Sequence, residues 1–482
     1  MTESRNLSKF AVPAEELERQ KEYAALVETV LQSRYPGEKP LAFVHTYGCQ
    51  GNVADGEKIK GILASVGFGL TDDLAAADLV LYNTCAIREH AQDRVFGNVG
   101  KLKPIKAQKR DLIIALCGCM MQQEYVAEKI KKSYPFVDLV FGTHVIHKLP
   151  EFLYRVLCGG KRVFDLSGGD GNIVEGLPVR RDGTFKAFVP IMYGCDNFCS
   201  YCVVPYVRGR ERSRDFDTVV DEVRHLAAQG YKDITLLGQN VNSYHKNEPA
   251  HLRFPALLRA VNDIPGDFLI RFMTSHPRDC SKELLDAMAD CDKVAKHLHL
   301  PVQSGNDRVL REMNRHYDRA RYLSLIDYAY QKMPGLSITS DIIVGFPGET
   351  DAEFEDTLSL VKQVKYTSLF TFIFSPRPGT KAALMDDPTP KEEKSRRFQA
   401  LTALQETIAA ERTAAMNGKT YRVLVEEPAK TDGWLSGRTE GNIIIEFPGD
   451  DGLIGTFQQV RVTEPRTWVL KGEPADPASF CM

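Results

Sequence analysis

Three cysteines in one short loop are the residues of this chain whose type and spacing point most directly to chemistry. Gly194 precedes Cys195, Cys199 and Cys202, which have the spacing C-x3-C-x2-C. Protein-bound [4Fe–4S] clusters are normally closed by four thiolates, whereas this motif supplies three. The fourth iron would therefore be open to an exogenous ligand, which suits a cluster that takes part in catalysis. We predict that these three cysteines bind such a cluster.

Zinc is the alternative occupant of the same three thiols. A structural zinc site takes four closed ligands, usually in paired C-x2-C or Cys/His groups. No fourth cysteine or histidine lies nearby in that pattern. The iron–sulfur interpretation is therefore favoured.

Three further cysteines follow strands of a predicted parallel sheet. Short apolar runs alternate with helical stretches from residue 41 onward, which is typical of such a sheet. The runs are 41–46, 78–83, 111–116 and 137–141. Cys49, Cys85 and Cys119 come just after the first three runs, and functional groups gather at the carboxyl edge of a parallel sheet. We predict that these thiols form a second three-ligand cluster site.

Burial as a small hydrophobic residue is the ordinary fate of a free cysteine and is the alternative for these three. Cys117 precedes Cys119 by two residues and is expected either to turn away from Cys119 or to remain within the strand end. The other thiols are expected to be structural or incidental: Cys158, Cys280, Cys291 and Cys481.

Composition sets the wider class of protein. A chain of 482 residues is long enough for two or three domains. The sequence has no apolar run long enough to cross a membrane and no secretory signal, so we expect a cytoplasmic protein without a membrane partner. Eleven cysteines in that compartment indicate metal or redox use rather than disulfides.

Charge argues against a general nucleic-acid binder. The formal net charge is −3, whereas such proteins carry a basic surface. A local basic patch directly follows the cysteine loop and is the predicted place of phosphate contacts. It consists of Arg208, Arg210, Arg212 and Arg214.

The order of the elements predicts an α/β protein in several parts. Residues 1–39 form an N-terminal arm, 40–157 a parallel-sheet domain and 158–180 a glycine-rich, strand-poor linker. A second series of apolar runs, at 187–192, 233–237, 268–273, 297–301, 338–344 and 369–374, alternates with helices. Six such units fit a partial (βα)6 barrel over 181–411 that carries the cysteine loop after its first strand. Short strands and turns over 414–477 predict a small C-terminal β-barrel.

The loop spacing, with Tyr201 directly before the third cysteine, resembles the radical S-adenosylmethionine superfamily. Together with the N-terminal three-cysteine domain and the small terminal barrel, known as a TRAM domain, the chain resembles the methylthiotransferases of that superfamily. The segments that carry the resemblance are 46–50, 206–214, 237–244, 300–305 and 374–377. One departure is Gly51, where the family more often has methionine; it changes no thiol.

The resemblance implies an enzyme with two [4Fe–4S] clusters and S-adenosylmethionine. One cluster would yield a 5′-deoxyadenosyl radical, and the other, on Cys49, Cys85 and Cys119, would supply the sulfur. The implied reaction is methylthiolation of C2 of N6-isopentenyladenosine 3′ of the anticodon, so the partners would be a tRNA anticodon stem-loop and a one-electron donor. Further cofactor contacts are assigned with the same resemblance to Tyr201, Gln303, Ser304 and Asp341, and glycines such as Gly345 would let the backbone approach the cofactor.

Two other readings remain open from the sequence. Sibling methylthiotransferases keep all six cysteines and act on a threonylcarbamoylated tRNA adenosine or on a ribosomal-protein aspartate. A non-catalytic iron–sulfur sensor that binds RNA through the terminal barrel is a different class of protein. The barrel segment does not favour it, because residues from Asn417 onward contain more acidic than basic side chains.

Overall fold

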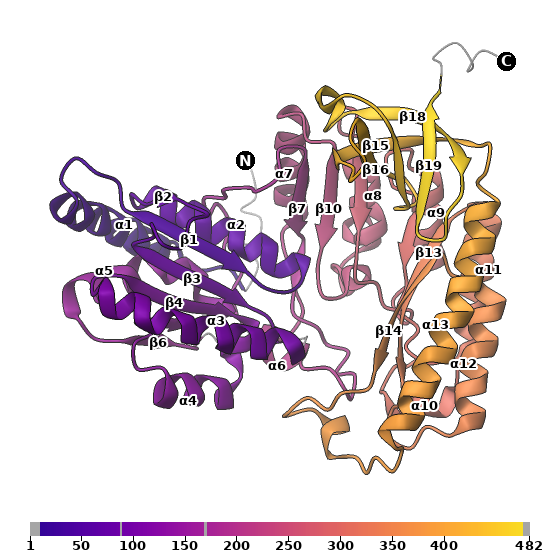
Figure 1. Ribbon diagram of the computed structural model, residues 1–482, viewed down its shortest axis with the longest axis horizontal. Coiled ribbons are helices and arrows are strands. Elements are labelled where there is room, and N and C mark those ends of the chain that lie inside the picture. Colours follow the sequence, from indigo (N-terminus) through magenta and orange to yellow (C-terminus); the bar gives the residue numbers. More distant parts are fainter. Residues whose placement is uncertain (1–9, 87–88, 168–170, 476–482) are drawn as a thin grey trace. The chain divides into compact units, whose positions relative to one another are not determined.

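The computed structural model describes residues 10–86, 89–167 and 171–475, so Cys481 lies outside the described residues. The chain forms two compact units, each considered by itself. Unit 1 takes in the chain up to Gly183 together with Pro190–Asp196 and Val203–Asp215. Unit 2 takes in Thr184–Val189, Asn197–Cys202 and the chain from Phe216 onward. Both units are drawn in Figure 1.

Unit 1 is built on a parallel sheet in the order β2-β1-β3-β4-β5-β6. Its strands are β1 (Leu41–Thr46), β2 (Gly69–Leu70), β3 (Leu79–Thr84), β4 (Ile113–Gly118), β5 (Leu139–Phe141) and β6 (Val163–Asp165). The four predicted strands are present, with ends shifted by up to two residues. The strand-poor interpretation of 158–180 was wrong at β6, because an edge strand this short leaves no distinct apolar run in the sequence.

Helices cover both faces of this sheet (Figure 1). They are α1 (Ala14–Arg34), α2 (Gln50–Ser65), α3 (Glu89–Gln108), α4 (Glu124–Ser133) and α5 (Leu149–Gly159). Alternate residues of β3 enter different cores: Leu79 and Leu81 pack with α1, α2 and α5, whereas Val80 and Tyr82 pack with α3 and α4. Buried Val27 and Leu31 on α1 make the predicted N-terminal arm part of this core.

Unit 2 contains the predicted partial barrel of six parallel strands. They are β7 (Lys186–Pro190), β10 (Asp233–Leu237), β11 (Leu269–Phe272), β12 (His297–His299), β13 (Ser337–Val344) and β14 (Ser368–Ile373). They form the sheets β11-β10-β7 and β12-β13-β14, and Ile270 bridges to Val294 just before β12.

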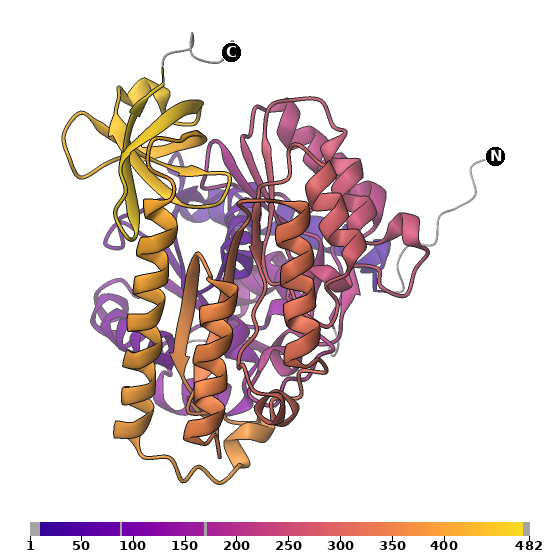
Figure 2. The same cartoon turned by 90° about the vertical axis from the view of Figure 1, so that its right-hand side faces the viewer.

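Helices line the outer side of these strands, as Figure 2 shows from the side. They are α7 (Phe216–Ala228), α8 (Phe254–Asn262), α9 (Lys282–Asp290), α10 (Asp307–Glu312), α11 (Arg319–Lys332), α12 (Asp351–Val364) and α13 (Lys391–Ala414). The helix α13 leads into the terminal barrel. No helix in the described part of the chain combines the length and apolar character that crossing a membrane requires.

The C-terminal segment of unit 2 closes into a barrel in the order β15-β16-β17-β19-β18. Its strands are β15 (Thr420–Pro428), β16 (Trp434–Thr439), β17 (Ile444–Pro448), β18 (Phe457–Glu464) and β19 (Val469–Pro474). The sequence predicts strands at 421–426, 433–438, 443–446 and 459–462, which coincide with parts of β15, β16, β17 and β18, whereas β19 was not predicted. Arg271 of β11 joins this barrel to the strands of the core, because its guanidinium donates to the carbonyls of Glu440 at 3.0 Å and Thr439 at 3.2 Å.

Candidate functional site

The three N-terminal cysteines meet at the carboxyl edge of the unit 1 sheet. Cys85 and Cys119 directly follow β3 and β4, and Cys49 is the N-cap residue of α2, three residues after β1. These strands are neighbours in the sheet, in the order β1-β3-β4. A hydrogen bond with Cys85 lowers the pKa of the Cys49 thiol to about 5. The three thiols therefore lie at the carboxyl edge of the sheet, where the sequence predicts them.

Cys119 and Cys117 lie in different surroundings although they are two residues apart. Cys117 is inside β4 and packs in the apolar core with α2 and α5, as predicted from its position. Cys119 packs with Ala86, Val203 and Val207 instead. Burial raises the pKa of the Cys119 thiol to about 11.

Glycines with a positive φ directly precede Cys49 and Cys119, two of the three cysteines of this edge. Gly48 has φ 110°, and a Cβ there would lie 2.4 Å from the Cβ of Cys85. Gly118 has φ 97°, and a Cβ there would lie 2.3 Å from the carbonyl oxygen of Thr84. A side chain at either position would be strained, and at Gly48 it would also collide with the Cys85 side chain.

We expect Gly118→Ala to lower the free energy of unfolding by about 3 kcal/mol, because backbone strain adds to a clash with Thr84. Gly97→Ala in α3 is the matched control, since a Cβ at Gly97 meets nothing within 4 Å. Replacing a mid-helix glycine in this way should add about 0.5–1 kcal/mol. Chemical denaturation of both variants measures the difference, and equal stabilities would refute this role of Gly118.

A buried arginine joins the Cys119 thiol to helix α2. Arg208 ends the helix α6 (Val204–Arg208), and its Nε donates to the Cys119 Sγ at 2.9 Å. Its Nη2 donates to Asn52 Oδ1 at 2.7 Å, and its Nη1 pairs with Asp55 Oδ2 at 2.6 Å. Asn52 in turn donates to the carbonyls of Tyr47 and Thr84 at 2.9 and 2.8 Å. Arg208, directly through Cys119 and indirectly through Asn52, thus connects the chain segments at the carboxyl ends of β1, β3 and β4.

This arginine corrects the prediction of a basic patch for phosphate contacts. Arg208, Arg212 and Arg214 are only 6%, 3% and 6% exposed. Arg214 pairs with Glu175 at 2.6 Å, and Arg212 donates to the Arg210 carbonyl at 2.8 Å. Of the four, only Arg210 has an exposed side chain, and it pairs with Asp196 at 2.9 Å. The alternation of arginines follows local turns and buried partners rather than an exposed basic face.

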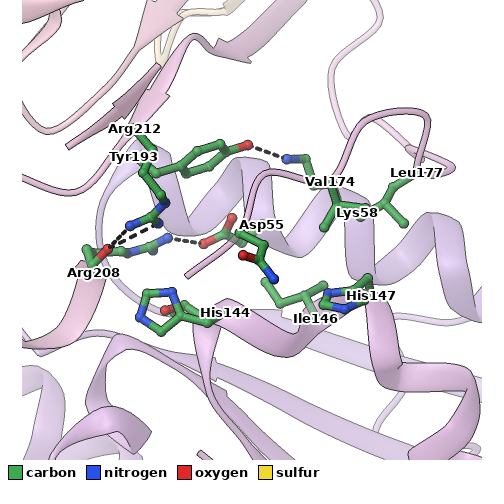
Figure 3. A pocket seen from close by; sticks show the side chains of 12 residues that line it. Asp55, Lys58, His144, Ile146, His147, Val174, Leu177, Tyr193, Arg208 and Arg212 are labelled. Atoms are coloured by element: carbon green, nitrogen blue, oxygen red, sulfur yellow. Dashed lines mark hydrogen bonds and ion pairs between the residues drawn. The ribbon is translucent and has the colours of Figure 1, made fainter. Parts of the chain in front are cut away.

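A small cavity of about 40 Å³ lies beside the Arg208–Asp55 pair in unit 1 (Figure 3). Lys58 lines it and donates to the Tyr193 hydroxyl at 2.7 Å. Burial lowers the pKa of His147, another lining residue, to about 4, so its ring is neutral near pH 7. A space of this size and polarity suits a few water molecules.

The C-x3-C-x2-C loop begins in unit 1 and ends in unit 2. Gly194 has φ 78°, and the Cys195 amide donates to the Gly209 carbonyl at 3.1 Å. In unit 2, the Ser200 amide donates to the Met313 carbonyl at 3.0 Å. Backbone hydrogen bonds to different partners therefore hold the two ends of the loop.

A second buried arginine contacts a cysteine of this loop within unit 2. Arg315 Nη1 donates to the Cys199 Sγ at 3.4 Å, and its Nη2 donates to the Pro301 carbonyl at 2.6 Å. Its Nε donates to the Tyr317 hydroxyl at 2.9 Å. The sequence analysis missed both thiol-contacting arginines. No local feature of the sequence marked either of them.

Two of the other predicted cofactor contacts are close together in unit 2. Gln303 has φ 70°, a strained value for a residue other than glycine. Its amide donates to the Asp341 carbonyl at 2.8 Å, and the Asp341 carboxylate lies 3.6 Å from His299 Nε2. Tyr201 packs against the apolar cluster of Phe346 and its neighbours.

Two residues predicted to serve the cofactor, Ser304 and Gly345, have close local neighbours. The Ser304 hydroxyl is buried, lies 3.5 Å from the Thr357 hydroxyl and accepts from the Asn306 amide at 3.2 Å. A Cβ on Gly345 would lie 2.5 Å from Lys394 Cγ. Glycine at that position therefore allows the close approach of Lys394 on α13, and an approach of the backbone to a cofactor stays a prediction.

The donor types of both triplets fit iron–sulfur clusters. Within the described residues, no three or more His, Cys, Asp or Glu side chains are grouped to hold a single metal ion. In a four-iron cluster each thiolate binds a different iron, so the thiols need not point at one centre. Such a cluster is favoured by three features of the chain: soft thiolate ligands, arginine side chains that donate to sulfur, and glycine turns that leave space around the sulfurs.

Three family models match the chain in sequence order. Uncharacterized protein family UPF0004 matches residues 42–142, the Radical SAM superfamily matches 189–361 and the TRAM domain matches 414–475. These matches follow the sheet of unit 1, the partial barrel and the terminal barrel.

Curated relatives match over nearly the whole chain. The tRNA-2-methylthio-N(6)-dimethylallyladenosine synthase of Acetivibrio thermocellus is 47% identical over 475 residues, covering 97% of this chain and 98% of the relative. The enzyme of the same name from Caldicellulosiruptor saccharolyticus is 48% identical over 437 residues, covering 91% of this chain and 93% of the relative.

A solved structure shares the fold at low sequence identity. The radical S-adenosylmethionine methyltransferase TsrM from Kitasatospora setae superposes with a TM-score of 0.52 and 16% identity, covering 83% of this chain and 81% of that one. This likeness concerns the fold alone.

Proposed function

The chain belongs to the family of tRNA-2-methylthio-N(6)-dimethylallyladenosine synthases, and from this membership we propose that it methylthiolates C2 of N6-isopentenyladenosine 3′ of the anticodon in tRNA. Support comes from 47% identity over 97% of the chain. The structural observation that carries the proposal is the gathering of Cys49, Cys85 and Cys119 on one sheet edge, apart in sequence from the C-x3-C-x2-C loop.

The two thiol triplets are proposed to hold two [4Fe–4S] clusters. Cys195, Cys199 and Cys202 would hold the radical S-adenosylmethionine cluster, and the sheet-edge triplet would hold the auxiliary cluster. Once bound, the clusters and S-adenosylmethionine supply radical and sulfur chemistry that acid–base side chains cannot direct at an aromatic C–H bond. The chain's own residues bind and orient these groups.

Unit 2 offers residues for orienting S-adenosylmethionine. Gln303, four residues beyond the carboxyl end of β12, lies beside Asp341 of β13, and barrels of this kind carry their functional groups at the carboxyl ends of their strands. His299 Nε2 lies 3.6 Å from the Asp341 carboxylate. Tyr201 presents an aromatic ring for the adenine. Ser304 is a weaker candidate, because its hydroxyl is engaged by Thr357 and Asn306.

Exposed aromatic rings on β14 are proposed to receive the prenylated adenine. Phe370 and Phe372 are two residues apart on this strand, so they lie on the same face, and each is 50% exposed. The Phe370 ring meets His299 edge to face at 5.9 Å, so it stands on the same side of the strands as the Asp341 carboxylate. Proteins that read RNA loops stack splayed bases on aromatic rings, and an isopentenyl group adds apolar surface to such a contact.

We expect Phe370→Ala with Phe372→Ala to raise the KM for a prenylated anticodon stem-loop about 10-fold or more, because stacking contributes about 1–3 kcal/mol per base. Leu26→Ala on α1 removes another exposed apolar side chain and serves as the control. Initial rates at varied stem-loop concentration measure the change. An unchanged KM would show that the substrate base does not lie on β14.

The partners follow from the same proposal. A tRNA substrate, an external one-electron donor and a cytoplasmic location suit a tRNA-modifying radical enzyme. With three of the four arginines after the loop buried, few phosphate contacts remain there, so activity should fall only modestly between low and moderate salt.

Nucleoside analysis of tRNA from a strain lacking the gene tests the function. The proposal expects loss of the methylthiolated nucleoside and accumulation of N6-isopentenyladenosine, reversed by the gene on a plasmid. Loss of a methylthiolated threonylcarbamoyladenosine, or a tRNA pattern left unchanged with a ribosomal-protein aspartate unmodified, would assign the chain to a sibling activity instead.

A further inference from the structure

Each of the three nitrogens of the Arg208 guanidinium has a contact. Nε faces the Cys119 sulfur, Nη1 faces Asp55 and Nη2 faces Asn52, at 2.9, 2.6 and 2.7 Å. Arg208 is 6% exposed, Asp55 4% and Asn52 0%. A planar fork with donors in fixed directions matches this set of acceptors, whereas a lysine ammonium is a point charge on a flexible stem.

A role in pairing charge alone does not account for this arrangement. Burying an Arg–Asp pair costs desolvation energy that the attraction between the charges often fails to offset. Asp55 and Asn52 instead fix the guanidinium so that its Nε–H is directed at the Cys119 sulfur. Asn52 is itself held by the carbonyls of Tyr47 and Thr84, which belong to the turns that carry Cys49 and Cys85.

Resting on the proposed function, we infer that Arg208 is a positioning residue for the auxiliary cluster: it donates a hydrogen bond to the Cys119 sulfur and offsets the negative charge of the thiolates. Hydrogen bonds to the cluster sulfurs and nearby positive charge raise the reduction potential of a cluster, because reduction adds an electron to an already anionic site. Arg208 therefore keeps this cluster bound and its potential high. Asp55 and Asn52 hold Arg208 in place.

The experiment compares iron content and reduction potential in the anaerobically reconstituted full chain. Arg208→Lys keeps the charge but not the fork and should lose part of the auxiliary iron and shift the auxiliary potential downward. The double variant Arg208→Gln, Asp55→Asn removes both charges and keeps amides that can hydrogen-bond to each other; it should fold and show a downward shift as well. Arg155→Lys, on an exposed arginine of α5, is the control and should match the wild type.

The radical S-adenosylmethionine cluster in the same molecules is the internal reference, because its EPR signal changes when S-adenosylmethionine is added. About eight irons in the wild-type chain would agree with the proposed function. About four would contradict the proposed function, whatever the Arg208 variants show. The inference is overturned if both Arg208 variants keep wild-type iron and potential, or if both clusters change equally in them. If circular dichroism shows that Arg208→Lys does not fold, the iron content and potential of the double variant alone test the inference.

Discussion

Replacing Cys49, Cys85 and Cys119 together by alanine should abolish the methylthiolated product while 5′-deoxyadenosine still forms from S-adenosylmethionine. These thiols lie on the sheet edge of unit 1, and the C-x3-C-x2-C loop that would cleave S-adenosylmethionine keeps all its cysteines. Bound iron should fall from about eight to about four per chain, since each cluster holds four. Iron analysis and chromatography of the nucleosides give both results from one preparation.

Cys117→Ala is the matched control for this variant. Cys117 is as deeply buried as Cys119 and two residues away, but it lies inside β4 in the apolar core. It should keep product formation and the full iron content. Product at the wild-type rate from the triple variant would show that the sulfur comes from elsewhere.

Replacing Cys195, Cys199 and Cys202 together by alanine should remove 5′-deoxyadenosine and product alike. The expected loss is to background, because no other residue of the chain is proposed to bind the cluster that cleaves S-adenosylmethionine. About four irons should remain, on the sheet edge of unit 1. Cys280→Ala, which removes a buried thiol of unit 2 outside the loop, is the control.

Retention of all iron, or loss of all iron, in the loop variant would contradict two separate sites. Together the two triple variants assign each chemical step to its own set of thiols. Their 5′-deoxyadenosine yields should differ even where both make no product.

The placement of the cysteines could be predicted from the sequence because parallel strands fix it. A thiol one residue after β3 or β4 is at the carboxyl edge whatever the helices do, and Cys85 and Cys119 are in those positions. The partial barrel was predicted in the same way, from six apolar runs with helices between them. The strands β6 and β19 were missed, because their apolar runs, at 163–164 and 468–470, are no longer than those found in loops.

The surroundings of the thiols could not be predicted because they depend on packing. In the sequence, the arginines from 208 to 214 look like an exposed basic face. In the structure, Arg208 ends a short helix and turns inward to Asp55, whose distance from it in the sequence gives no hint of contact. Arg315 likewise reaches Cys199 only because Pro301 and Tyr317 hold it there.

The measurement that tests the central claim most directly uses purified, reconstituted protein and three anticodon stem-loops, with isopentenyladenosine, threonylcarbamoyladenosine or unmodified adenosine at the target position. S-adenosylmethionine with a deuterated methyl group is supplied with a chemical reductant, and the nucleosides are analysed by mass spectrometry. We predict a product from the isopentenyladenosine stem-loop alone, heavier by a methylthio group that carries all three deuterium atoms. A product without sulfur, or equal conversion of the three stem-loops, would contradict the account.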